Sequence, residues 1–274
     1  MTPDVAAPAV RAAGAIRRLI LDASFHAGVG HIGSALSIAD IVAALHFGVL
    51  RCERPDDPER DRFILSKGHA ALALFAALHL RGWIDAAELL TYCGDATRLG
   101  VHPEAGVPGV DISTGSLGHG LSIGVGMALA ARMQGDTRRR TFVLLSDAEC
   151  NEGAVWEAIM FAAHHRLSNL VAIVDANGQQ ALGYTRDVLD LGPLPAKWRA
   201  FGWDAHEVDG HDVAALQRTI SGLADVADRP HVVVARTVAG KGVPFMEGQI
   251  DWHYLPMTRE HYELACRELE AATT

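Results

Sequence analysis

The sequence lacks the features that mark several large classes of protein. Its 274 residues include four cysteines, at positions 52, 93, 150 and 266, and no CxxC motif. Cysteines scattered in this way predict neither a disulfide framework nor a zinc site, so we expect reduced thiols in a cytoplasmic protein. No apolar run approaches the roughly 18–20 residues that a membrane span needs, and no signal peptide is recognised.

Basic residues are also scarce. The chain has 24 lysines and arginines against 33 aspartates and glutamates, which gives a formal net charge of −9 at pH 7. Nucleic-acid-binding domains normally carry a basic face, so we expect no nucleic-acid partner. An anionic ligand must then be held by a local device, such as a metal ion, a helix N-terminus or some of the fourteen histidines.

The motifs of three common catalytic classes are missing as well. There is no GxxxxGK[ST] phosphate loop, no GxSxG elbow and no HExxH zinc motif. Residues 28–33 do spell GxGxxG, but they follow an expected helix over residues 9–26, whereas the dinucleotide fingerprint follows a strand. We interpret them instead as a glycine-rich turn that presents His31 with little steric cover.

What the chain does contain is an alternation of strand-like and helix-like segments. Apolar runs over residues 141–146 and 169–174 flank a helical stretch over 154–166, and further strands are predicted over 62–65, 204–208 and 231–236. This order predicts an α/β fold, with a mostly parallel twisted sheet and helices on both faces. No linker is apparent, so residues 1–274 are expected to form a single domain. Another helix is expected over residues 38–50, with Ser37 as its N-cap.

Two oxygen-bearing side chains follow neighbouring strands of this predicted sheet. Asp147 follows the first run, and Asn177 follows the second, thirty positions later. A strand–helix–strand unit brings both strand ends to the edge of the sheet where open α/β proteins bind ligands. Mg²⁺ prefers oxygen ligands and completes its shell with waters and phosphates. The pair therefore predicts half of a metal–diphosphate site, although Asp147 alone could be a helix cap and Glu152 a charge near a helix N-terminus.

Other candidate residues stay ambiguous when each is judged alone. Lys67 and His69 lie where a strand meets a helix, and they could face a phosphate or belong to a simple turn with a solvated lysine. His102 and His253 lie in two long loops, and neither predicts a function by itself.

The glycine cluster at residues 115–120 also allows two interpretations. Glycine lets a flat ring or a diphosphate approach the backbone closely. The alternative is close packing of the following helix through Gly120, Gly124 and Gly126. Both can hold on different parts of the segment.

Taken together, these segments resemble the transketolase family of thiamine diphosphate enzymes, and in particular the N-terminal subunit of split bacterial transketolases. The resemblance runs in order through GVGHIGSALS, FILSKGHA, VHPE, STGSLGHGLSIGVGMALA, SDAECNEGAVWEA, VDANGQQ, WRAFGWDAHEVDGHD and GKGVPFMEGQIDWH. It implies a thiamine diphosphate-binding fold that forms the diphosphate-binding domain. It also implies transfer of a two-carbon ketol unit from a ketose to an aldehyde, with thiamine diphosphate and Mg²⁺ (or Ca²⁺ or Mn²⁺) as cofactors.

The resemblance further implies roles for individual residues. The metal ligands would be Asp147, Asn177 and the backbone carbonyl of Gln179. The cofactor would contact His69, Gly115, Ser116, Leu117, Ala148, Asn177, Lys241 and His253. The catalytic set would comprise His31, His102 and His253, which handle the sugar, and Glu152, which lies at a subunit contact near the cofactor.

Three departures from the family pattern have consequences. The usual Gly-Asp-Gly is Ser146-Asp147-Ala148 here, so the Ala148 N–H can serve a diphosphate only if φ is negative. A phosphate-binding arginine of many relatives is replaced near Cys93, and Arg98 is the nearest candidate. The pyrimidine-binding and C-terminal domains are absent from residues 1–274. We therefore expect an inactive single chain that works with a partner subunit in an α2β2 heterotetramer.

Two alternatives to the transketolase interpretation remain at this point. The chain could be part of a split acyloin-forming or acyl-transferring enzyme that uses the same cofactor. It could also be a non-catalytic subunit that binds the cofactor poorly and regulates its partner. The sequence alone does not identify the donor or the acceptor.

Overall fold

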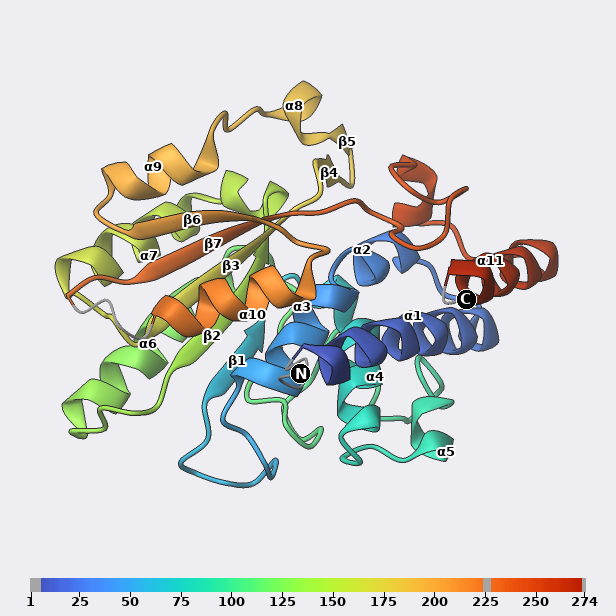
Figure 1. Ribbon diagram of the computed structural model, residues 1–274, viewed down its shortest axis with the longest axis horizontal. Helices are drawn as coiled ribbons and strands as arrows, with labels where there is room; N and C mark the ends of the chain where they lie inside the picture. The colour runs from blue at the N-terminus through green and yellow to red at the C-terminus, as the bar shows by residue number, and fades with distance from the viewer. Residues whose placement is uncertain (1–5, 224–227, 273–274) are drawn as a thin grey trace, which may run out of the picture.

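The computed structural model describes residues 6–223 and 228–272 (Figure 1). Five strands form one sheet in the order β1-β2-β3-β7-β6, and every neighbouring pair is parallel. The strands are β1 (Arg62–Leu65), β2 (Thr141–Ser146), β3 (Leu170–Ala176), β6 (Asp204–Asp209) and β7 (His231–Arg236). Because all five run the same way, their carboxyl ends meet at a single edge of the sheet.

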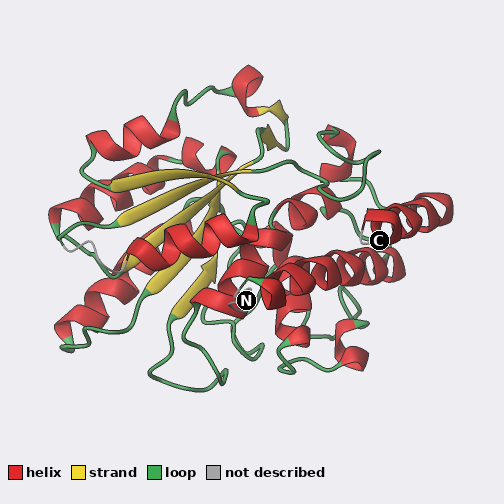
Figure 2. Cartoon of the chain, viewed as in Figure 1, coloured by secondary structure: helices red, strands yellow, loops and turns green. Residues whose placement is uncertain are grey.

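The sheet is covered by helices on both faces, as predicted (Figure 2). Successive side chains of a strand point to opposite faces, so Phe142 and Leu144 enter one core while Val143 and Leu145 enter the other. The first core is completed by α1 (Ala7–Ala27), α3 (Ala39–Ala44), α4 (Ala71–Leu80) and α10 (Val213–Gly222). The second is completed by α6 (His119–Met133), α7 (Gly153–His164) and α9 (Leu194–Ala200).

The remaining elements are short, apart from the last helix. They are α2 (Ile32–Ser37), η1 (Leu45–Val49), η2 (Gly68–Ala70), α5 (Ala86–Leu89), η3 (Ala148–Asn151), β4 (Gln179–Gln180), β5 (Gly183–Tyr184), α8 (Thr185–Val188), η5 (Ile250–His253) and α11 (Arg259–Ala272). The segments that follow β1, β2, β3 and β7 all start from the carboxyl edge of the sheet, and they carry most of the candidate site.

The prediction of a single helix over residues 38–50 is wrong in its boundaries. The structure has α2 up to Ser37, then α3, then a π-helical turn over Leu45–Val49. Ser37 does not cap a helix, because its hydroxyl donates to the carboxylate of Asp175 at 2.7 and 2.9 Å. A buried carboxylate is a stronger acceptor than a neutral group, which explains why this hydroxyl turns away from the helix start.

Two findings concern the described chain as a whole. All four cysteines are free thiols, and three of them, Cys52, Cys150 and Cys266, are buried. Within residues 6–223 and 228–272, no helix has both the length and the apolar character that a membrane crossing requires.

Candidate active site

A cavity of about 290 Å³, lined by several histidines and other polar side chains, lies at the carboxyl edge of the sheet. It is bordered by the start of α2, by η2, by the loop before α6, by the ends of β2 and β3, and by η5. The predicted site residues that line it are His31, His69, His102, Gly115, Leu117, Ala148, Glu152, Asn177, Gln179 and His253. The fold thus brings together residues that are more than 200 positions apart in the sequence.

The ends of β2 and β3 lie side by side, as the sequence predicts. Ser146 pairs with Asp175 in the sheet, and the Asp147 N–H donates to the Asp175 carbonyl at 3.1 Å. The Asp147 carboxylate accepts a hydrogen bond from the backbone N–H of Gly178 at 2.9 Å, directly beside Asn177. The three residues expected to bind the metal are therefore neighbours at the ends of β2 and β3. Asn177 and Gln179 line the cavity, whereas Asp147 lines an adjoining hollow of about 140 Å³.

The chemistry of these groups fits a divalent cation. Burial raises the pKa of Asp147 to about 6, and the nearby charge of Asp175 adds to this effect. The hydrogen bonds from the Gly178 and Ala148 N–H groups and the charge of Lys67 offset it only in part. The side-chain oxygens of Asp147 accept only backbone N–H groups in the hydrogen bonds found for the described chain. A bound Mg²⁺ would supply the missing positive charge.

Waters and phosphates would have to complete the shell of such an ion. Among the described residues, no group of three or more His, Cys, Asp or Glu side chains is placed to hold a metal. Mg²⁺ commonly takes one or two carboxylates and obtains its other ligands from phosphates and water. The donor set therefore suits a metal–diphosphate more than an ion held by protein alone.

Three histidine rings gather at the same cavity. The ring centroids of His31, His69 and His253 lie 5.5 to 5.7 Å from one another. Burial lowers the pKa of His253 to about 4, with further contributions from His31 and Lys67. Burial likewise lowers the pKa of His31 and takes that of His69 well below its ordinary value. A neutral imidazole can accept a proton at one ring nitrogen and donate a hydrogen bond from the other.

His31 has an unusual backbone conformation. It precedes α2 with a φ of 60° and a ψ of 18°, in the left-handed region that favours glycine. Such a conformation costs a non-glycine residue on the order of 1 kcal/mol. The Nδ1 atom of His31 is buried and has no hydrogen-bond partner in the described protein. An orphaned nitrogen at the cavity wall is a position where a ligand group fits.

The glycines of residues 115–124 serve close packing. A Cβ on Gly115 would lie 2.9 Å from the His102 ring, and one on Gly118 would lie 2.8 Å from the Glu152 side chain. Gly120 packs against Ser66 in the same way. The predicted helix packing through Gly120 and Gly124 is confirmed, but the inclusion of Gly126 is wrong, because nothing lies within 4 Å of a Cβ there.

Lys67 and Asp175 form a buried ion pair beneath the cavity. Lys67 is fully buried, so the alternative of a solvated lysine is wrong. Asp175 also accepts a hydrogen bond from the Asn177 side-chain amide at 2.9 Å, which orients that amide at the rim. Sequence reasoning missed Asp175, although a carboxylate within the apolar run of β3 was a usable signal.

Glu149 is a second buried carboxylate that sequence reasoning missed. It accepts hydrogen bonds from the hydroxyl of Ser66, from the Gly118 N–H at 2.9 Å and from the Ser146 N–H at 3.3 Å. Burial raises its pKa, while these hydrogen bonds act in the opposite direction. One side chain thereby joins the ends of β1 and β2 to the start of α6.

Asp147, Ser116 and Lys241 are predicted site residues that are not among the described residues that line this cavity. Ser116 is exposed, and Lys241 forms an ion pair with Glu247 at 3.3 Å beside a different cavity. Arg98 is exposed and pairs with Glu88, away from the cavity wall. The cofactor roles of Ser116 and Lys241 stay predictions. Ala148 has a negative φ, so the position does not require glycine, and its backbone N–H donates to the Asp147 carboxylate at 2.9 Å.

Comparison with known proteins identifies the family of this chain. The model that describes "Transketolase, thiamine diphosphate binding domain" matches residues 9–270. The chain belongs to the transketolase family. Over 255 residues it is 40% identical to one of the subunits of the apulose-4-phosphate transketolase of Phocaeicola vulgatus, covering 92% of this chain and 90% of that one. Over 261 residues it is 40% identical to 6-deoxy-6-sulfo-D-fructose transketolase subunit SqwG of a Clostridium species, with 94% of each chain covered.

Solved transketolases share the fold. A transketolase mutant from Pichia stipitis matches 96% of this chain with a TM-score of 0.90 and 30% identity, and the transketolase of Campylobacter jejuni matches 98% with a TM-score of 0.89 and 27% identity. This transketolase-family chain spans only 41% and 43% of the length of those two chains. The thiamine diphosphate-binding fold expected from the sequence is confirmed by these matches.

Proposed function

We propose that this chain is the diphosphate-binding subunit of a two-chain transketolase. The observation that carries the proposal is the meeting of His31, His69 and His253 with the Asp147–Asn177 rim at one edge of the sheet. The relatives of similar length support it, because their names describe them as transketolase subunits.

The metal would lie at the ends of β2 and β3, and the cofactor would lie in the cavity beside them. Asp147, Asn177 and the carbonyl of Gln179 would hold Mg²⁺ (or Ca²⁺ or Mn²⁺) against the diphosphate of thiamine diphosphate. His69, Gly115, Ser116, Leu117, Ala148, Lys241 and His253 would contact the cofactor. When bound, thiamine diphosphate supplies the electron sink for breaking the carbon–carbon bond beside a ketose carbonyl.

The histidines of the chain would manage the sugar and its protons. His253, with a pKa of about 4, is neutral at pH 7 and can accept a proton from a donor hydroxyl or donate a hydrogen bond to a carbonyl. His31 and His102 face the same cavity and would orient the donor hydroxyls. Glu152, packed against Gly118, would act at the subunit contact.

A small ketose donor and an aldehyde acceptor are the proposed substrates. No arginine is among the described residues that line the cavity, and Lys67, which does line it, is already paired with Asp175. An anionic group at the far end of the sugar, such as the phosphate or the sulfo group in the names of the two relatives, would therefore need a cation from the partner.

A second subunit would complete the site. The cavity volume lies near the lower end of the roughly 300–1,000 Å³ that is usual for ligand pockets. Tyr254 lines the cavity and is exposed, and the chain neighbours of its lining residues, Leu182 and Leu255, also expose apolar side chains, as an interaction surface does. The partner would carry the pyrimidine-binding domain and the catalytic glutamate in a cytoplasmic α2β2 heterotetramer.

The test is cofactor binding and ketol transfer by the reconstituted pair. Asp147→Ala should weaken Mg²⁺-dependent binding of thiamine diphosphate by roughly 100-fold, because a metal ligand is lost. The matched control is Asp190→Ala, which removes an exposed carboxylate from the hollow beside Asp147 and should leave binding unchanged. Titration calorimetry measures both. Equal binding by the Asp147 variant and the native pair would contradict the metal assignment.

The same reconstitution separates the alternatives. Ketol transfer from any ketose donor supports the transketolase assignment. Tight cofactor binding without ketol transfer, but with acyloin formation from other donors, would replace it with the acyl-transferring enzyme. If the assembled pair does not bind the cofactor, the interpretation of this chain as a non-catalytic, regulatory subunit is favoured.

A further inference from the structure

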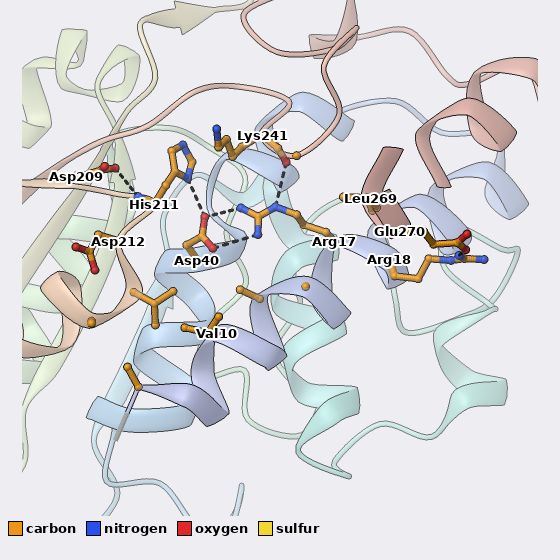
Figure 3. A pocket seen from close by; sticks show the side chains of 16 residues that line it. Val10, Arg17, Arg18, Asp40, Asp209, His211, Asp212, Lys241, Leu269 and Glu270 are labelled. Carbon is orange, nitrogen blue, oxygen red and sulfur yellow. Dashed lines mark hydrogen bonds and ion pairs between the residues drawn. The ribbon is translucent and has the colours of Figure 1, made fainter. Parts of the chain in front are cut away.

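An ionic cluster lies at the floor of a second cavity, of about 740 Å³, between α1, α10 and α11 (Figure 3). At its centre is Asp40 of α3, whose side chain is only 7% exposed. The carboxylate of Asp40 accepts hydrogen bonds from both terminal nitrogens of Arg17 and, at 2.8 Å, from Nδ1 of His211. Asp40 therefore fixes the orientation of two side chains that come from opposite sides.

Each of those two side chains also holds the segment that follows β7. Nε of Arg17 donates to the Lys241 carbonyl at 3.0 Å. Nε2 of His211 accepts from the Val238 N–H at 2.9 Å. Val238 and Lys241 are three residues apart in the chain. Asp40 therefore orients both of the side chains that bind this turn.

The charge state of the cluster suits this arrangement. Burial alone would raise the pKa of Asp40, but the hydrogen bond from His211 and the charge of Arg17 outweigh it and hold the pKa below its ordinary value. Because Nε2 of His211 accepts from a backbone N–H, Nδ1 must carry the proton that it donates to Asp40. The carboxylate thus selects the tautomer that can support Val238.

The supported segment transmits its position toward the catalytic cavity. The Gly248 N–H donates to the Ala239 carbonyl at 2.9 Å and closes the segment into a loop. Val243 and Met246 of that loop are fully buried. Two residues after Gly248 the η5 turn begins, and it ends at His253. A shift at Val238 or Lys241 is therefore passed along a packed unit.

We propose that Asp40, acting through Arg17 and His211, is a positioning residue that fixes the segment from Val238 to His253 and thereby places the His253 imidazole in the catalytic cavity. The effect on the segment stands on contacts within this chain. The effect on turnover rests on the proposed transketolase function.

The first test measures order in the segment itself. Asp40→Asn keeps the size of the side chain and removes its charge. Hydrogen–deuterium exchange of the isolated chain should show amides of residues 238–253 exchanging at least tenfold faster, with β2 and β3 unchanged. Arg17→Lys keeps a cation near Asp40 but cannot bond Asp40 and the Lys241 carbonyl together, so it should raise exchange around Lys241. If Asp40→Asn does not fold, Arg17→Lys decides the outcome.

The matched control is Asp61→Asn. Asp61 is as buried as Asp40, and its carboxylate bonds the backbone N–H groups of Arg51 and Arg140 and the guanidinium of Arg51, where β1 and β2 begin. It should lower the melting temperature while leaving exchange of residues 238–253 at the native rate. The proposal would be overturned if residues 238–253 exchanged at the same rate in the Asp40 and Asp61 variants. This holds whether that common rate is the native one or a faster one.

The second test uses the reconstituted pair with thiamine diphosphate and Mg²⁺. Asp40→Asn should lower kcat/KM for the ketose donor at least tenfold. Its Kd for the cofactor should change less, because Lys241 and His253 are the only proposed cofactor contacts in the segment, and Asp147 and Asn177 are untouched. Faster exchange with unchanged kcat/KM would overturn the placement of His253. If the native pair shows no ketol transfer with any donor, the proposed function fails while the exchange result still judges the positioning role.

Discussion

His46 is a buried histidine on the turn that follows α3, outside the candidate active site. Its ring packs edge-on against Phe63, with centroids 5.2 Å apart. Both ring nitrogens are buried and without a hydrogen-bond partner in the part of the chain that the structure describes. Burial, followed by the charges of Arg81 and Arg60, lowers the pKa of His46 to about 3. The folded protein therefore holds this ring neutral.

This residue should make the protein sensitive to acid. The unfolded chain binds a proton at His46 below a pH of about 6.5, whereas the folded chain does not until about pH 3. The stability contributed by the neutral ring is thus present above pH 6.5 and is lost as the pH falls toward 3. His46→Leu removes this proton linkage. For each pH unit by which the solution is acidified within this window, the free energy of unfolding of the variant should therefore rise by about 1.4 kcal/mol relative to that of native protein.

Urea unfolding of the isolated chain at several pH values measures this gain. The control is His26→Leu, at an exposed position of α1, where solvent reaches the ring in both states. A constant difference between the His46 variant and native protein from pH 7 to pH 4 would contradict the prediction.

Residue pairs divide into those that the sequence could reveal and those that it could not. Asp147 and Asn177 were predictable, because each follows a strand-like run and parallel strands end at one edge. Lys67 and Asp175 are 108 positions apart, and Arg17 and His211 meet only through Asp40. A single sequence contains no periodic signal for such pairings, so these buried contacts appear only in the structure.

The packing of α6 on the sheet offers a test at the scale of an element. A Cβ on Gly124 would lie 2.4 Å from the Val143 side chain, whereas a Cβ on Gly126 would meet nothing within 4 Å. Gly124→Ala should cost about 1–3 kcal/mol of folding stability, because the helix must move off β2. Gly126→Ala should add about 0.5–1 kcal/mol, because alanine favours a helix.

The two alanine variants serve as controls for each other, since they make the same change two residues apart on one helix. Denaturant unfolding of the isolated chain should give shifts of opposite sign. Shifts of the same sign would show that the contact between Gly124 and Val143 does not set the distance of α6 from the sheet.

Buried strands were predictable from their apolar runs, whereas the boundaries of the short, fully buried helices α2 and α3 were not. The residues of β1 and β7 match the predicted runs over 62–65 and 231–236, because both are short apolar runs with clear boundaries. Every residue of α2 and α3 is buried. A helix with no polar face gives no amphipathic period, so the break at Ile38 and the π turn at Leu45–Val49 left no mark in the sequence.

Assembly is the test that belongs to the whole molecule. The chain has a mass of 29.3 kDa. The exposed apolar side chains near the cavity favour association with the partner, and the proposed heterotetramer predicts that light scattering of an equimolar mixture gives the mass of two copies of each chain. A mass equal to one copy of each chain would contradict the proposed heterotetramer.

Because all five strands run in the same direction, residues inside the strands and residues in the connections at the carboxyl edge are under different constraints. Residues of the strand interiors must preserve the pairing of β1, β2, β3, β7 and β6, whatever the chemistry at the rim. The connections that leave the carboxyl edge can diverge without breaking that ladder. Specificity for new sugars can therefore be acquired by drift in a few rim segments, while the architecture inherited from an ancestor stays unaltered.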